Sequence, residues 1–151
     1  MIYIIDHKDS FTHNVVHQFE NFDDVTCDNY NEINESKLKK SKVIVFSPGP
    51  GAPKDYPISS NIYKRFKGKK KIIGICLGFQ QILYCEKGKI IKQKKIFHGY
   101  QSKIKVTGEN SLFKKNRKFN VGRYHSLKLK EPFVAKNFEI TMRCAISNIA
   151  M

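Results

Sequence analysis

Short apolar runs in the first half of the chain predict strands. Three of them are rich in β-branched residues and are typical of strands buried on both faces: MIYII at 1–5, KVIVFS at 42–47 and KKIIGI at 70–75. A further run, DVTCDNY at 24–30, also favours a strand. We therefore expect strands at these places before residue 76.

Helical patterns separate these runs. The first helix is indicated by apolar residues at helical spacing, namely Phe11, Val15, Val16 and Phe19. Asp9 or Ser10 is placed to cap its first turn. Further helices are expected at 35–40, at 58–66 and from about 77 to 86. Strands that alternate with helices predict an α/β fold with an open, doubly wound, mostly parallel sheet.

Beyond Gly88 the pattern changes to short alternating runs without helical segments between them. These runs are KIIKQKKIF at 89–97, SKIKVTG at 102–108, KFNVGRYHSLKL at 118–129 and FEITMRCAI at 138–146. They predict an antiparallel β extension attached to the α/β core. The length of 151 residues favours a single domain over 1–151.

The formal net charge of +15 raises the question of nucleic-acid binding. Most of the 28 basic residues are lysines spread along the chain, which suit a solvated surface better than a phosphate clamp. Charge alone speaks to solubility and non-specific association. We therefore expect no specific nucleic-acid partner.

The chain shows no pattern of a membrane span, a signal peptide or a metal-binding motif. No apolar run approaches the roughly 20 residues of a membrane span, and the N-terminus has no signal-peptide pattern, so we expect a cytoplasmic protein without a membrane partner. The cysteines show no paired spacing of metal or redox motifs and are expected to be free thiols; they are Cys27, Cys76, Cys85 and Cys144. No metal and no cofactor is predicted.

Cys76 lies in GICLGFQ at 74–80, directly after a predicted strand and before a predicted helix. Ligands collect at the carboxyl ends of strands in open α/β sheets, and a nucleophile on a sharp strand-to-helix turn needs small neighbours such as Gly74 and Gly78. The amides of the following helix are expected to lower the thiol pKa. The alternative is a buried core cysteine, since free cysteine is among the most buried residue types.

The stretch SPGPG at 47–51 also follows a predicted buried strand. Its prolines and glycines form a rigid loop that exposes backbone N–H groups, as an oxyanion site requires. An ordinary tight turn is the alternative, because proline and glycine are the usual turn residues.

Five ordered motifs carry a resemblance that runs the length of the chain: DSFTHN at 9–14, SPGPG at 47–51, GICLGFQ at 74–80, HGYQS at 98–102 and RYHSL at 123–127. Their order and spacing resemble the class I glutamine amidotransferases, with a flavodoxin-like fold. They look most like the small subunits of anthranilate synthase and aminodeoxychorismate synthase, of tryptophan and folate biosynthesis.

The resemblance implies a glutaminase subunit. Cys76 would attack the carboxamide of glutamine, form a glutamyl thioester and release ammonia to a chorismate-binding synthase partner. It implies that the substrate-binding positions are Gly49, Pro50, Gly51, Leu77, Gln80, Ser126 and Leu127, with the loop glycines and the Leu77 N–H serving the oxyanion.

One departure concerns the general base. The family's catalytic His and Glu belong to an H-P-E motif C-terminal to everything present here, and the chain ends at CAISNIAM without it. Either the sequence is truncated before that motif or glutaminase chemistry has been lost. We favour truncation, because Cys76, Gln80 and SPGPG serve no evident purpose in an inactive chain. Another histidine as the base stays open, with His125 the first candidate.

A second function of a different class is a non-catalytic partner-binding or regulatory module on the same fold. It would leave Cys76 unreactive while binding to a synthase chain persists. The sequence does not separate the tryptophan from the folate pathway, since that chemistry lies on the partner.

Overall fold

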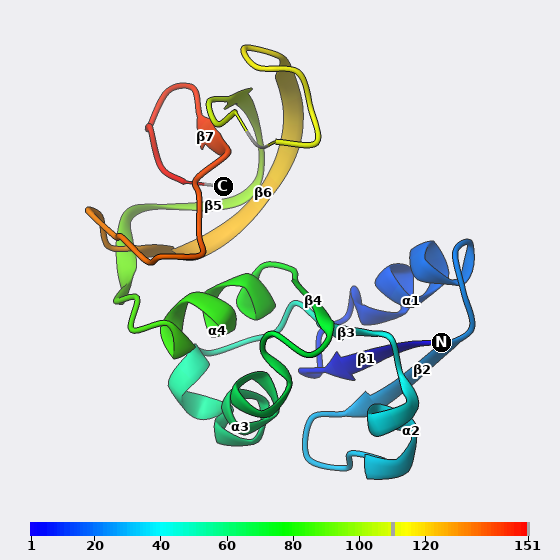
Figure 1. Ribbon diagram of the computed structural model, residues 1–151. Helices are drawn as coiled ribbons and strands as arrows, with labels where there is room; N and C mark the ends of the chain where they lie inside the picture. The colour runs from blue at the N-terminus through cyan, green and yellow to red at the C-terminus, as the bar shows by residue number, and fades with distance from the viewer. Residues whose placement is uncertain (110, 151) are drawn as a thin grey trace. The chain divides into compact units, whose positions relative to one another are not determined.

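The structure is a computed structural model that describes residues 1–109 and 111–150 (Figure 1). Contacts within the chain divide it into two compact units, a first unit of Met1–Lys87 and a second unit of Gly88–Met151. Among the residues so described, no helix is long and apolar enough to cross a membrane.

The first unit is built on a parallel sheet with the order β2-β1-β3-β4. Its strands are β1 (Ile2–Asp6), β2 (Val25–Asn29), β3 (Val43–Phe46) and β4 (Lys71–Gly74). Each begins within one residue of the start that the apolar runs predict. The predicted strands and their parallel arrangement are therefore confirmed.

Helices cover both faces of this sheet. On one face, Tyr3 and Ile5 of β1 join a core cluster with α2 (Glu35–Lys40), α3 (Pro57–Phe66) and α4 (Leu77–Cys85). On the other, Ile2 and Ile4 pack against α1 (Thr12–Glu20), which Figure 1 shows on the opposite side of β1 from α2 and α3. Full burial of one such side chain contributes about 2 kcal/mol. The doubly wound fold is confirmed.

The cap predicted for α1 is wrong. The N-cap residue is Phe11, and no side chain caps it. Asp9 Oδ1 instead accepts the N–H of Phe11 at 2.8 Å, which closes the turn before the helix. Asp6 Oδ1 receives the hydroxyl of Thr12 at 2.6 Å. The acidic side chains thus order the loop after β1 rather than the first helical turn.

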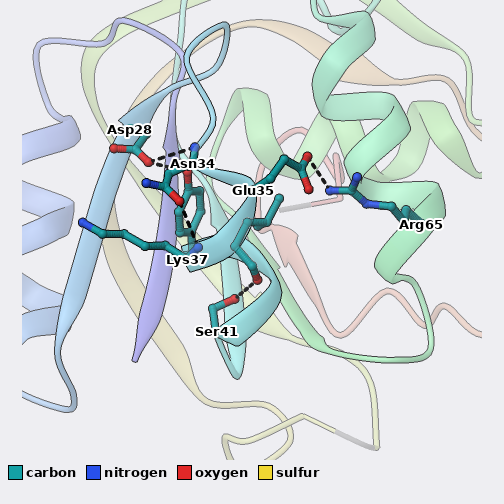
Figure 2. Close-up of polar contacts among 8 residues, drawn as sticks. Asp28, Asn34, Glu35, Lys37, Ser41 and Arg65 are labelled. Carbon is teal, nitrogen blue, oxygen red and sulfur yellow. Dashed lines mark hydrogen bonds and ion pairs between the residues drawn. The ribbon is translucent and has the colours of Figure 1, made fainter.

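The short helix α2 depends on side chains at its start (Figure 2). Asn34 Oδ1 accepts the N–H of Lys37 at 3.0 Å, and Asp28 Oδ2 accepts the N–H of Asn34 at 3.3 Å. Glu35 pairs with Arg65 of α3 at 2.9 Å, an exposed contact that contributes little. Since six residues are too few for a helix to be stable alone, the cap and the buried Leu38 hold it in place.

The second unit is an antiparallel sheet with the order β6-β5-β7, which confirms the predicted extension. Its strands are β5 (Ile90–Val106), β6 (Lys118–Leu129) and β7 (Met142–Cys144). The separate strands predicted at 89–97 and 102–108 are one strand with register shifts between Lys92 and Phe97 and between His98 and Tyr100. The run at 138–146 forms a strand over three residues only.

In the first unit, α4 meets the end of β3 at a glycine. A Cβ on Gly78 would fall on the carbonyl oxygen of Phe46 and lie 2.6 Å from the Phe46 Cβ. The N–H of Gly78 donates to the carbonyl of Ser47 at 3.2 Å. Only a residue without a side chain allows this approach.

We predict that Gly78→Ala lowers the free energy of unfolding by about 2 kcal/mol or more, because the methyl group must displace backbone. The measurement is the urea midpoint. Gly122→Ala is the matched control, since a Cβ there meets nothing within 4 Å. Equal midpoints for the two variants would contradict the proposed close approach.

Candidate active site

Cys76 occupies the turn between β4 and α4 with φ +54° and ψ −106°, a conformation that side-chain-bearing residues rarely adopt. A Cβ on Gly74 would lie 2.5 Å from the backbone of Gly78, so the turn tolerates no side chain at either position. Cys76 itself is only partly buried. This is the strained elbow that the spacing of GICLG predicts, and it favours a nucleophile over a core cysteine.

The electrostatics of Cys76 differ from the expectation. Burial raises the pKa of the thiol, a hydrogen bond from the Leu77 N–H lowers it, and the charge of Asp9 raises it. Burial prevails, so the prediction of a lowered pKa is wrong. The thiol is therefore mostly protonated at neutral pH, and its use as a nucleophile requires a base.

The loop 47–51 lies against this turn. A Cβ on Gly49 would be 2.6 Å from Leu77 Cδ2 and 2.5 Å from His7 Cβ, which shows how closely the loop backbone approaches both residues. Tyr56 donates its hydroxyl to the carbonyl of Pro50 at 2.9 Å. Gly51 has φ +73°, which glycine adopts without strain. The loop that the sequence predicts therefore adjoins the residue after Cys76.

Gln80 lies one turn along α4, and its N–H donates to the carbonyl of Cys76 at 3.1 Å. Its side chain is buried, with 6% exposed. The first unit thus brings together the predicted positions Cys76, Leu77, Gln80 and Gly49.

Ser126 and Leu127 lie on β6 in the second unit. The first register shift of β5 falls opposite Ser126, because Lys92 pairs with Leu127 and Phe97 pairs with His125. Such bulges interrupt a ladder and are frequent next to binding sites. Ser126 is exposed, and the carbonyl of Leu127 accepts the side-chain N–H of Gln93 at 2.9 Å.

The structure describes the side chains of three histidines, His7, His13 and His17. His7 is fully buried, with Nδ1 3.2 Å from the Ser47 carbonyl oxygen and Nε2 2.9 Å from Ser59 Oγ, so both ring nitrogens are engaged. His13 is exposed, and the exposed His17 lies 3.6 Å from Glu20. The side chains of His98 and His125 lie outside the described residues.

Burial lowers the pKa of His7 to about 4, against smaller raising effects from its hydrogen bond with Ser47 and from Asp6. The sequence analysis did not single out His7. Its position directly after a buried strand was the available signal, because that is where side chains reach the carboxyl edge of the sheet.

All four cysteines are free thiols. In the described part of the chain, no cluster of three or more His, Cys, Asp or Glu side chains could hold a metal ion.

The first unit is thus an α/β domain in which a cysteine lies on a strained strand-to-helix turn beside a Pro/Gly loop. Residues 3–151 match the family of class I glutamine amidotransferases. The chain belongs to this family, as the five motifs predict.

Relatives and solved structures agree with this assignment. The chain is 38% identical to anthranilate synthase component 2 of Lactococcus lactis over 93% of its length and 72% of that protein. It is 33% identical to aminodeoxychorismate synthase component 2 of Klebsiella aerogenes over 95% of its length and 78% of that protein. The solved structure of a glutamine amidotransferase from Thermotoga maritima shares the fold, with a TM-score of 0.73 at 14% identity over 99% of this chain and 68% of that one.

The buried His7 predicts a pH dependence of stability. Its pKa in the folded state lies near 4, below its unfolded value of about 6.5, so the unfolded chain binds the extra proton. The contribution is complete above pH 6.5 and is lost as the pH falls toward 4, by at most about 3 kcal/mol. Urea midpoints at pH 7.5 and pH 5 should differ more for the wild type than for His7→Asn. An equal pH slope in both would contradict this.

The charge of Asp9 predicts a change in thiol reactivity. Asp9→Asn keeps the oxygen that accepts from Phe11 but removes the charge that raises the pKa of Cys76. Alkylation of Cys76 by iodoacetamide at neutral pH should accelerate about two- to threefold. Asp24→Asn, an equal charge change at an exposed site, is the control and should have no effect. A slower reaction in Asp9→Asn would show that Asp9 does not act through its charge.

Proposed function

We propose that this chain is a glutaminase subunit in which Cys76 is the nucleophile. The observation that carries the proposal is the strained turn of Cys76 between Gly74 and Gly78, with the loop 47–51 packed against Leu77. A strained backbone conformation persists only where the surrounding structure maintains it, and here it presents a thiol at the carboxyl edge of the sheet.

The proposed reaction begins when the Cys76 thiolate attacks the side-chain carbonyl carbon of glutamine. The carbonyl oxygen becomes an oxyanion, for which the N–H of Leu77 and the loop glycines Gly49 and Gly51 are the donors. Collapse of this intermediate breaks the C–N bond, and the nitrogen takes a proton and leaves as ammonia. Water then hydrolyses the thioester to glutamate and frees the thiol.

The remaining predicted positions would hold the substrate. Gln80 and Pro50 belong to the first unit, and the binding of the amino-acid end of glutamine is assigned to Ser126 and Leu127 of the second unit. The family motifs at these positions support the assignment.

The raised pKa of Cys76 supports the need for a general base. We propose that this base belongs to a His/Glu motif outside residues 1–151 and that these residues form a single amidotransferase domain with it. The chain aligns with 72% of the length of the Lactococcus lactis protein.

The names of the relatives support a partner. They are second components of anthranilate and aminodeoxychorismate synthases, so we propose that the ammonia passes to a chorismate-binding synthase chain.

Four free thiols fit a reducing compartment, and the proposed location is the cytoplasm. A non-catalytic module that binds the same partner is the second candidate.

The test is glutamate release from glutamine in the presence of the synthase partner and chorismate. If the proposed base lies outside residues 1–151, a chain extended through its natural reading frame should turn over steadily, whereas residues 1–151 alone should be slower by several orders of magnitude. Cys76→Ser in the extended chain should abolish turnover.

Cys85→Ser is the matched control, since it makes the same change at the last residue of α4, away from the turn, and should leave the rate unchanged. Equal, robust rates for the two lengths would place the base within residues 1–151, with His125 the first to mutate. Full activity of Cys76→Ser would refute the proposed nucleophile.

A further inference from the structure

The carbonyl oxygen of Ser47 lies between two donors from distant parts of the first unit. The N–H of Gly78, in the first turn of α4, lies 3.2 Å away, and Nδ1 of His7, directly after β1, is also at 3.2 Å. Ser47 is the first residue of the loop 47–51. One oxygen atom therefore connects the end of β1, the Pro/Gly loop and the helix that begins at Cys76.

The hydrogen bonds define the tautomer of His7. The Ser47 carbonyl oxygen only accepts, and the Ser47 hydroxyl, 3.3 Å from Nδ1, donates to the Pro48 carbonyl at 2.6 Å, so Nδ1 carries the hydrogen. Nε2 is then an acceptor, and the hydroxyl of Ser59 on α3 donates to it at 2.9 Å. The lowered pKa of His7 agrees with a neutral ring. The backbone N–H of His7 also donates to Ser47 Oγ at 2.9 Å.

The ring has little freedom to move. Tyr56 meets it edge-on with a centroid separation of 4.7 Å, and the same Tyr56 donates its hydroxyl to Pro50 in the loop. Tyr30 stacks at 6.2 Å. Gly49 has no space for a Cβ above His7 Cβ. His7 thus contacts the loop at its first residue, at Gly49 and, through Tyr56, at Pro50.

We propose that His7 is a positioning residue that fixes the loop 47–51 against the start of α4, so that the loop amides and Cys76 keep one geometry. It does not touch substrate; it acts through the Ser47 carbonyl and the Gly49 backbone. The inference rests on the proposed glutaminase function for its catalytic meaning, but the hold on the loop is measurable without it.

The test compares His7→Phe, which keeps the ring volume and loses the side-chain hydrogen bonds to Ser47 and Ser59, with His7→Asn, which retains a donor and an acceptor near the Nδ1 position. Ser59→Ala keeps the ring and removes the Nε2 donor. In each folded variant, Cys76 is alkylated by iodoacetamide and by a chloromethyl ketone analogue of glutamine. Hydrogen exchange is followed at the amides of Gly78 and Ile75; the latter donates to Phe46 and not to Ser47, at 3.0 Å.

We expect His7→Phe to slow the alkylation of Cys76 by the glutamine analogue about tenfold. The rate of alkylation by iodoacetamide should change less than about twofold. The N–H of Gly78 also donates to the Ile75 carbonyl at 2.9 Å, so its exchange should accelerate severalfold rather than lose all protection, with exchange of the Ile75 amide unchanged. In His7→Asn, the alkylation rate with the glutamine analogue and the exchange rate of Gly78 should both lie close to the wild-type values. Ser59→Ala should change both rates in the same direction as His7→Phe, by about a third as much. If His7→Phe does not fold, the Ser59→Ala pattern decides.

Equal slowing with both reagents, or exchange that accelerates alike at Gly78 and Ile75, would show a general loss of stability and overturn the proposal. So would unchanged rates and unchanged exchange in His7→Phe. If the wild type shows no preference for the glutamine analogue but Gly78 exchange still responds selectively, the glutaminase function fails and the positioning role of His7 stands.

Discussion

Where β3 ends, the carbonyl groups of Phe46 and Ser47 face the turn and first residues of α4 across a gap too narrow for a methyl group. The N–H groups of Ile75 and Gly78 close this gap with hydrogen bonds of 3.0 Å and 3.2 Å. Cys76 lies between those two donors, so its backbone is fixed on both sides and its positive φ follows from the chain path. The conformation of the thiol is thus a consequence of how the helix meets the sheet.

The fold positions the Cys76 thiol but does not lower its pKa. The enclosure that holds the turn also removes water from the thiol, and burial outweighs the favourable N–H of Leu77 in setting its pKa. A protonated resting thiol is protected from adventitious oxidation and is activated only when a base is present. The chain path thus fixes where the thiol lies, whereas burial sets its protonation state.

Local patterns predict the first unit well because the central strands β1 and β3 are almost wholly buried apolar runs and α1 has a clear helical period. The elbow at Cys76 was predictable because glycines at 74 and 78 are needed for a close approach. The direction of the Cys76 pKa shift could not be predicted, because burial of the thiol depends on tertiary packing. For the same reason Asp9 was assigned to the wrong turn, and the continuity of β5 through its bulges was missed, since a bulge interrupts the alternation that defines a strand. The role of His7 depends on Ser47 and Ser59, which are 40 and 52 positions away.

The strand β4 forms one border of the parallel sheet, with Ile73 40% exposed. A border strand offers its backbone groups to any neighbouring chain, and apolar residues there invite strand-to-strand association between molecules. Lys69 and Lys71 lie exposed at the beginning of this border, whereas Lys70 donates to the backbone carbonyl groups of Lys39 and Ser41. Lysines at such a place repel a second copy and impose a desolvation cost on pairing. The exposed lysines therefore place positive charge at the beginning of this border strand, which disfavours its pairing with a second copy.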